Sequence, residues 1–525
     1  MKEARLLVEI KELGVARGGG VELERFSLAL HAGETVVLLG EAGSGKDAVL
    51  RALDGQLERG EDVSGTIRFG EGEARPAARK QRPPLRTAFL PGAASHPLDG
   101  QAGAASQLER VIARKLGCPR GGAREELRNA LARFAGAPSV EALDAPAATL
   151  DDATVAWGLL AAAIATTPEL LLCDHPFADL SPVAAAALSK ALRDEQARLG
   201  FAIVYAAREP QPVLRLGGRT LVLRQGRVVE EGDTAHLVSG QTHAYTQALF
   251  KALPGAAPAR PPRPASRGEP LLQVQGLVLN PEPRKTPRQR DLLGFELRRG
   301  ASLALLGEAG SGRHTLLRAL LGLERRPGRI LFDAVDLNLL SEAMTLRLRR
   351  RVAFITADDD ALDPRMTLWD TVDEPLRAHL RLSRELTAGY RDTALKRVGL
   401  ASHDGRRPVA TLSPFDKRRL QVARAIVGAP LLVVVDEPLR GLDAVAQTTM
   451  RDLLAEFRVE SQAAFLVVTS DFAVAQALCD DAFVFDKGRV VERGALASLV
   501  RAPKDEATKA LIEAVAPLPS GAAEV

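Results

Sequence analysis

The stretch Leu38–Gly45 reads Leu-Leu-Gly-Glu-Ala-Gly-Ser-Gly, and Leu305–Gly312 repeats it residue for residue. Each copy follows an apolar run typical of a buried strand and opens a pattern typical of a helix. Backbone N–H groups in such a glycine-rich turn surround a phosphate at the positive end of the following helix. The sequence therefore predicts two phosphate-binding P-loops. Their candidate binding residues are Gly40, Gly43, Ser44, Gly45, Lys46 and Asp47 in the first loop, and Gly307, Gly310, Ser311, Gly312, Arg313, His314 and Thr315 in the second.

A later apolar run that ends in aspartate accompanies each loop. These runs are Leu170–Asp174 and Leu431–Asp436. In a P-loop site a lysine reaches the β- and γ-phosphates of the nucleotide and a hydroxyl helps to hold Mg²⁺. A loop paired with such an aspartate is typical of enzymes that bind nucleoside triphosphates. We therefore expect ATP and Mg²⁺ as cofactors, with Asp174 and Asp436 as cofactor-binding residues at the metal.

A second repeat and a proline-rich stretch divide the chain into two halves. Gln225–Gly232 matches Lys487–Gly494, in the same order relative to the P-loops. The residues between the halves are dense in Pro, Ala and Arg, which excludes a helix interior and favours an extended linker. We predict a first domain over residues 1–252, a linker over residues 253–270 and a second domain over residues 271–525.

Each half alternates short apolar runs with longer helical patterns. Strands that are apolar on both faces and separated by helices predict a mainly parallel sheet covered on both sides. The expected strands are Val36–Leu39, Leu170–Cys173, Ile203–Ala206 and Leu221–Leu223 in the first half, and Leu303–Leu306, Leu431–Val435, Phe465–Val468 and Ala482–Phe485 in the second.

Composition narrows the class of protein. Hydrophobic residues make up 46% and charged residues 26% of the 525 residues, which is ordinary for a water-soluble protein. The formal charge is only +4, because 66 acids interleave with 70 bases, so we expect no nucleic-acid partner. The N-terminal residues lack the apolar run of a signal peptide, and the longest apolar runs are too short to span a membrane.

Several further stretches carry a family resemblance. The chain resembles the ATP-binding subunits of bacterial peptide- and nickel-type importers, which belong to the ATP-binding-cassette (ABC) proteins, with two cassettes fused in tandem. Leu362–Leu368 and Glu374–Leu376 resemble the S-L-N-P-R-M-T and E-P-L of those subunits. Asp436–Asp443 is similar to their Walker B motif with its D-loop, and His243–Leu249 resembles their H-P-Y-T-R-A-L.

This resemblance implies an architecture, cofactors and partners. The fold is expected to be α/β, with two tandem P-loop ABC domains, each with a mainly parallel sheet, an antiparallel β edge and a helical subdomain. ATP and Mg²⁺ are the implied cofactors. Transmembrane permease subunits, and through them a solute-binding protein, are the implied partners. The protein is expected in the cytoplasm, peripheral on the inner face of the cell membrane, with membrane contact only through its partners.

The family pattern also implies that the two cassettes pair head to tail within the chain. Each composite site then joins the Walker residues of one cassette to the signature of the other. Site one combines Lys46, Asp174 and His175 with Ser413–Phe415. The members of site two are Arg313, Thr315, Asp436 and Glu437, facing Asp151–Ala153.

The first cassette departs from the family pattern at its catalytic positions. Asp47 replaces the Walker A hydroxyl, and it serves either as a hard oxygen ligand for Mg²⁺ or as an anion that satisfies the helix dipole. His175 stands where the family has a glutamate that orients the attacking water, and Asp151–Asp152 replace small signature residues. Loss of a positioned base lowers the rate of hydrolysis by a factor of about 10²–10⁴.

The second cassette departs at other positions. Arg313 replaces the Walker A lysine, whose compact ammonium fits the loop, and Pro414 lacks the N–H of a signature residue. Glu437 is the one retained catalytic candidate. The switch histidine is replaced by Ala207 in the first cassette and Ser470 in the second.

Three functions stay open at this point. The first is a peptide-type ABC importer subunit that binds nucleotide at the first Walker A and hydrolyses ATP poorly or not at all. The second is a pseudo-ATPase, either a scaffold or a nucleotide-sensing regulator derived from such a subunit. The third, a cassette protein that acts on ribosomes or DNA, is disfavoured by the proline-rich linker and the small net charge.

Overall fold

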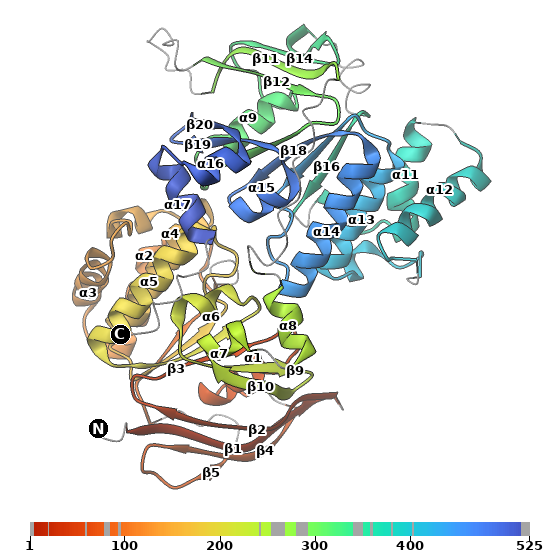
Figure 1. Ribbon diagram of the computed structural model, residues 1–525. Helices are drawn as coiled ribbons and strands as arrows, with labels where there is room; N and C mark the ends of the chain where they lie inside the picture. The colour runs from red at the N-terminus through yellow and green to blue at the C-terminus, as the bar shows by residue number, and fades with distance from the viewer. Residues whose placement is uncertain are drawn as a thin grey trace.

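The same succession of elements occurs twice in the computed structural model (Figure 1). We call β1 to α8 the first cassette and β11 to α17 the second cassette. The predicted linker lies almost entirely outside the described residues. The structure describes residues 5–18, 20–57, 60–77, 84–92, 96–240, 243–251, 253, 268–279, 292–339, 350–357, 361–379, 382–401 and 404–515.

A six-stranded sheet forms the centre of the first cassette, in the order β10-β9-β3-β8-β7-β6. Its strands are parallel except for β10, which pairs antiparallel with β9. All four strands predicted for this half are confirmed. The strands are β3 (Thr35–Leu39), β6 (Thr87–Leu90), β7 (Leu170–Asp174), β8 (Ala202–Ala207), β9 (Arg219–Arg224) and β10 (Arg227–Asp233).

The second cassette repeats this sheet in the order β16-β17-β18-β13-β19-β20, again with only the last pair antiparallel. The four strands predicted here are also confirmed. The strands are β13 (Ser302–Leu306), β16 (Val352–Thr356), β17 (Leu432–Asp436), β18 (Ala464–Thr469), β19 (Asp481–Asp486) and β20 (Arg489–Ala495).

A separate antiparallel sheet flanks each parallel sheet. Its strands alternate buried and exposed side chains, because one face packs on the core and the other meets water. The order is β2-β1-β4-β5 in the first cassette and β12-β11-β14-β15 in the second. The strands are β1 (Leu6–Arg17), β2 (Gly20–His31), β4 (Glu61–Phe69), β5 (Arg75–Pro76), β11 (Pro270–Val278), β12 (Leu292–Arg298), β14 (Arg329–Phe332) and β15 (Val335–Asp336).

Helices cover the parallel sheets and form a helical group beside each one (Figure 1). The helices of the first cassette are α1 (Lys46–Leu53), α2 (Ala104–Leu116), α3 (Arg120–Ala132), α4 (Asp152–Ala165), α5 (Pro182–Leu199), α6 (Gln211–Leu216), α7 (Thr234–Ser239) and α8 (Ala244–Phe250). Those of the second are α9 (Arg313–Leu320), α11 (Leu368–His379), α12 (Arg384–Arg397), α13 (Pro414–Val427), α14 (Ala444–Ser461), α15 (Phe472–Leu478), α16 (Leu496–Arg501) and α17 (Glu506–Val515). The predicted combination of parallel sheet, antiparallel edge and helical group is confirmed.

The parallel sheets bring the P-loops and the aspartates to one edge. Strand β3 is buried along its whole length, and the first P-loop follows its carboxyl end. Asp174 is the last residue of β7, which lies one strand away across β8. Because parallel strands end at the same edge, Asp174 faces the first turn of α1. The second cassette places Asp436 and α9 in the same way.

The last helix of the second cassette returns to the first cassette. Helix α17 packs against α5 (Figure 1), and Arg215 of α6 donates a hydrogen bond of 2.7 Å to the carbonyl oxygen of Ala514. Within the described ranges, no helix is both long enough and apolar enough to cross a membrane.

Candidate functional site

Both P-loops end in a glycine that the backbone requires. Gly45 and Gly312 precede α1 and α9 with φ of 101° and 99°, in the region that favours glycine. Neither helix has a side-chain hydrogen bond at its N-cap within the described part of the chain. The first-turn N–H groups of both helices therefore point into the loop without a capping side chain, as phosphate binding requires.

The two repeated stretches of the sequence contact each other. Gly226 donates a 3.0 Å hydrogen bond to the carbonyl oxygen of Ser44, and Gly488 donates one of 2.8 Å to that of Ser311. A Cβ at Gly312 would lie 2.8 Å from the Cα of Gly488. The β9–β10 and β19–β20 turns thus buttress the P-loops, which explains why both stretches recur in the sequence.

Lys46 is buried inside the first P-loop. Its Nζ donates a 2.8 Å hydrogen bond to the carbonyl oxygen of Glu41, and burial lowers the pKa of this lysine. The N–H of Glu41 in turn donates to the hydroxyl of Tyr245 at 3.1 Å. Tyr245 belongs to α8, and the guanidinium of Arg224 stacks on its ring at 4.9 Å. The His243–Leu249 stretch therefore supports the first P-loop, a role that the sequence resemblance did not reveal.

Three metal-ligating side chains meet beside Lys46. The Nε2 atom of His175 lies 3.6 Å from Oδ1 of Asp174 and 3.9 Å from Oδ1 of Asp47. The neighbouring His175 and the ammonium of Lys46 lower the pKa of Asp47 to about 2, against the effect of burial. Burial lowers the pKa of His175. Asp47 thus faces the side chains at the end of β7 as well as the helix dipole.

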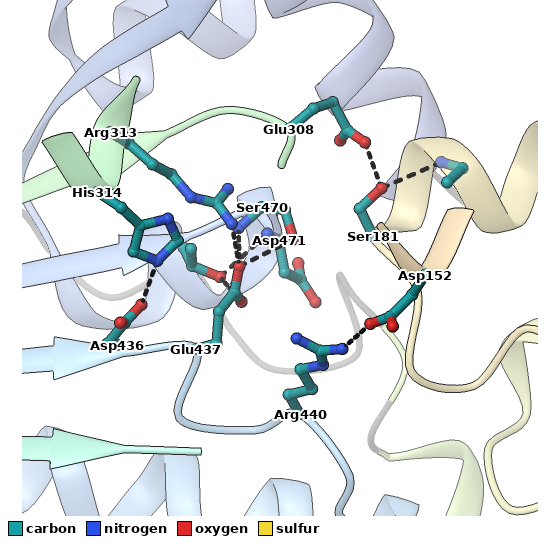
Figure 2. Close-up of polar contacts among 12 residues, drawn as sticks. Asp152, Ser181, Glu308, Arg313, His314, Asp436, Glu437, Arg440, Ser470 and Asp471 are labelled. Atoms are coloured by element: carbon teal, nitrogen blue, oxygen red, sulfur yellow. Dashed lines mark hydrogen bonds and ion pairs between the residues drawn. The ribbon is translucent and has the colours of Figure 1, made fainter. Parts of the chain in front are cut away.

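In the second cassette the corresponding side chains pair with one another (Figure 2). Arg313 is buried, and its Nη2 donates a 2.7 Å hydrogen bond to Oε1 of Glu437. The backbone N–H and the hydroxyl of Ser470 donate to the same oxygen at 2.9 and 3.1 Å. The hydroxyl of Thr469 donates to Oε2 at 3.0 Å. Glu437 therefore has four donors before any substrate arrives.

The predicted metal residue of this cassette is also paired. Nε2 of His314 lies 3.1 Å from Oδ1 of Asp436 (Figure 2). Thr315 follows on α9 and is partly exposed. The structure thus brings Arg313, His314, Asp436 and Glu437 together, but as two internal pairs.

The signature residues have local partners. Asp151 is the N-cap of α4, where its Oδ1 accepts a 2.8 Å hydrogen bond from the N–H of Thr154. Asp152 forms an ion pair with Arg440 of the second cassette (Figure 2). Ser413 caps α13 by accepting from the N–H of Asp416 at 3.1 Å, and Pro414 occupies the first turn, where no N–H is needed.

One cavity of about 330 Å³ lies between the cassettes. Asp151–Ala153 of the first cassette and Arg313 and Glu437 of the second line it, so the structure brings the two sides of site two together. The hydroxyl of Ser181 also donates to Glu308 of the second P-loop across this boundary (Figure 2). Ser181 and Arg440 are cross-cassette residues that the sequence reasoning missed. Both residues follow a Walker B motif by a few positions in the sequence, and this position was the one indication of their role.

The two loops differ in how well they fit a nucleotide. Both loops have uncapped first-turn N–H groups and a buried serine hydroxyl, of Ser44 or Ser311, without a hydrogen-bond partner among the described residues. In the first loop the charge of Lys46 also faces the loop. These groups fit a phosphate. In the second, Arg313 and His314 hold Glu437 and Asp436, which are the groups that would face the metal and the attacking water. The second loop does not fit Mg²⁺–ATP in this arrangement.

The comparisons with known proteins agree on one family. A family profile described as ABC transporter matches residues 23–178 and 291–440. The chain is 32% identical over 512 residues to the uncharacterized ABC transporter ATP-binding protein YejF of Escherichia coli K12, covering 93% of this chain and 94% of that protein. The peptidoglycan transport ATP-binding protein YejF of Agrobacterium fabrum is 29% identical, with 98% and 97% covered.

A third relative is the glutathione import ATP-binding protein GsiA of Salmonella typhimurium. It is 28% identical over 569 residues, covering 98% of this chain and 90% of that protein. The profile matches both cassettes, and the relatives align over nearly the whole chain. The chain therefore belongs to the ABC transporter family and carries two ABC domains.

Proposed function

We propose that this chain is the ATP-binding subunit of an importer for peptides or related small solutes, and that its ATP hydrolysis is impaired. Two of the three relatives named above are a glutathione import ATP-binding protein and a peptidoglycan transport ATP-binding protein, and glutathione is a small peptide. The peptide-importer stretch Leu362–Leu368 and the E-P-L at Glu374–Leu376 support the same class.

The pairing of Arg313 with Glu437 is the observation that carries the claim of impaired hydrolysis. A general base must accept a proton from water, but the carboxylate of Glu437 already accepts four hydrogen bonds, one of them from a buried guanidinium. A carboxylate has about four lone-pair sites, so an attacking water would have to displace one of these donors to reach it. The first cassette has His175 at the equivalent position.

Nucleotide binding is assigned to the first P-loop. Lys46 is the one Walker A lysine in the chain, and the first-turn N–H groups of α1 would hold phosphate beside it. ATP and Mg²⁺ are the cofactors of this proposal, with Asp174 as the metal residue. The partners are membrane-spanning permease subunits and, through them, a solute-binding protein. The protein would then lie peripherally on the inner face of the cell membrane.

A Lys46→Ala variant tests this assignment. Calorimetric titration of Mg²⁺–ATP into the purified chain should show binding that the variant loses, because the charge that faces the β- and γ-phosphates is gone. Arg313→Ala, at the matched position of the second loop, should leave the affinity of the first site unchanged. Equal affinity of the wild type and Lys46→Ala would contradict the assignment.

The second candidate is a pseudo-ATPase scaffold or nucleotide-sensing regulator. The contacts between Asp152 and Arg440 and between Ser181 and Glu308 favour it, because they join the cassettes without nucleotide. Partners distinguish the candidates. Co-purification of the chain with membrane-spanning permease subunits would favour the importer subunit, whereas nucleotide binding by a chain that co-purifies with no such subunit would favour the scaffold or regulator.

A further inference from the structure

Asp47, Asp174 and His175 place three metal-ligating atoms in one small volume. Asp47 comes from the first turn of α1, while Asp174 and His175 follow one another at the carboxyl end of β7. One donor atom from each lies within 4.8 Å of the other two. Two of the separations are 3.6 and 3.9 Å, both measured from Nε2 of His175.

These separations are close to those of ligands on one ion. Zinc bonds to imidazole nitrogen and carboxylate oxygen are about 2.0–2.2 Å long, so at the tetrahedral angle two ligands of one ion lie about 3.3–3.6 Å apart. The separation of 3.6 Å between His175 and Asp174 meets this value, and that of 3.9 Å between His175 and Asp47 exceeds it by about 0.3 Å. The separation between the two carboxylates, at most 4.8 Å, needs a closure of up to about 1.2 Å.

The imidazole of His175 is an independent indication of a ligand. Its side chain is only 7% exposed, and neither ring nitrogen has a hydrogen-bond partner among the described residues. An unpaired buried polar group costs about 1–3 kcal/mol, and a bound ion is one of the explanations for such a group in a native protein. Oδ1 of Asp47, which faces it, is likewise buried without a hydrogen-bond partner in the described structure.

The second cassette lacks the third ligand. His314 lies beside Asp436 there, but the residue that corresponds to His175 is Glu437, and its carboxylate is held by Arg313, Thr469 and Ser470. The two cassettes therefore provide a matched comparison within one chain.

We propose that Asp47, Asp174 and His175 form a site for a divalent transition metal in the first cassette. One imidazole with two carboxylates suits Zn²⁺, Mn²⁺ or Fe²⁺ better than Mg²⁺, whose ligands are oxygens. The ion would join the first turn of α1 to the end of β7 in the absence of nucleotide. This site does not depend on ATP binding or hydrolysis. It shares Asp174 with the proposed Mg²⁺ site and adds the imidazole of His175 as a ligand.

The charge of Lys46 limits the affinity of this site. Its Nζ lies 3.9 Å from Oδ1 of Asp47. Removal of this ammonium should tighten metal binding, because a cation competes with the ion for the same carboxylate. Lys46→Ala is thus expected to strengthen metal binding and to abolish nucleotide binding. The result for one ligand can therefore contradict its proposal without contradicting the other.

The experiment is a calorimetric titration of Zn²⁺ into the full chain, purified without a histidine tag and stripped with a chelator, in the absence of nucleotide. We expect one saturable ion, at least a tenfold weaker affinity in His175→Ala and in Asp47→Ser, and an unchanged affinity in His314→Ala. Circular dichroism of each variant checks that it is folded, and Asp47→Ser covers the case in which His175→Ala is not.

Visible absorption of bound Co²⁺ gives a second readout, because the loss of an imidazole ligand should shift its bands. The absence of saturable binding in the wild type would overturn the proposal. So would equal affinities in the wild type, His175→Ala and Asp47→Ser, since the ion would then be held by other His or Cys residues.

Discussion

Nη2 of Arg313 lies 2.7 Å from Oε1 of Glu437, so the residue that replaces the Walker A lysine is paired with the candidate catalytic base of the same cassette. A lysine ammonium inside the loop would face the phosphates. The longer and planar guanidinium instead reaches the end of β17. This one substitution in the P-loop therefore removes the ammonium that would face the phosphates and also pairs the candidate catalytic base.

This pair should contribute to stability. Removal of one partner from a buried pair leaves the other charge uncompensated, which costs about 3 kcal/mol. We expect Arg313→Met to lower the free energy of unfolding by about that amount in urea titrations. Arg318→Met, on the same helix and 63% exposed, is the control and should change it by less than about 1 kcal/mol. Equal effects of the two variants would contradict the pairing.

Restoration of the family residues should allow the second P-loop to bind Mg²⁺–ATP. In the double variant Arg313→Lys with His314→Ser, Glu437 and Asp436 lose their internal partners and a hydroxyl returns beside the metal position. We expect a second Mg²⁺–ATP site with at least tenfold higher affinity than any second site of the wild type, measured by calorimetry. An unchanged stoichiometry would show that other residues block the loop.

The last glycine of the first P-loop should tolerate no side chain. A Cβ at Gly45 would lie 2.6 Å from the carbonyl oxygen of Glu22, whereas a Cβ at Gly43 meets no atom within 4 Å. Both have φ in the left-handed region, which costs about 1 kcal/mol for alanine. We expect Gly43→Ala to lose about 1 kcal/mol of stability and Gly45→Ala about 3 kcal/mol. Thermal unfolding of both variants tests the difference.

The two adjacent aspartates Asp151 and Asp152 should contribute differently to the free energy of unfolding. Asp151→Ala removes the N-cap of α4 and should cost about 1 kcal/mol at any salt concentration. Asp152 is 41% exposed and Arg440 is 44% exposed, so Asp152→Ala should cost less than about 1 kcal/mol and lose its effect in 1 M salt. Unfolding at low and high salt distinguishes them, and a salt-independent cost at Asp152 would count against the ion pair.

The free energy of unfolding should depend on pH through Glu209, which lines the cavity between the cassettes. Burial, together with Asp179 and Asp471, raises the pKa of Glu209 from its ordinary 4.5 to about 8. Between these two values the folded chain binds a proton that the unfolded chain has lost, so this group lowers the stability as the pH rises from about 4.5 to about 8. Glu209→Gln should remove that part of the slope. Unfolding at pH 5, 6, 7 and 8 tests it, and parallel slopes would exclude the assignment.

The sequence predicted four of the six strands of each parallel sheet, because continuous apolar runs such as Leu431–Val435 have few alternatives in an α/β chain. It also predicted that Asp174 and Asp436 lie beside the P-loops, since both end strands at that edge of the parallel sheets. The domain limits stay predictions.

The side-chain partners could not be predicted. The pairing of Arg313 with Glu437 depends on the reach of a guanidinium across the loop, and that of Asp152 with Arg440 depends on how the cassettes meet. Asp151 replaces a small signature residue in the sequence, and its carboxylate caps its own helix in the structure. Tyr245 supports the first P-loop from a helix 204 residues further along the chain, and no local pattern reveals such a contact.

The most direct test of the central claim is a calorimetric titration of Mg²⁺–ATP with phosphate release followed in the same sample. The account predicts one bound nucleotide per chain, lost in Lys46→Ala, and phosphate release no faster than that of Glu437→Gln. Two bound nucleotides with steady release that depends on Glu437 would contradict it, because the pair between Arg313 and Glu437 would then open during turnover.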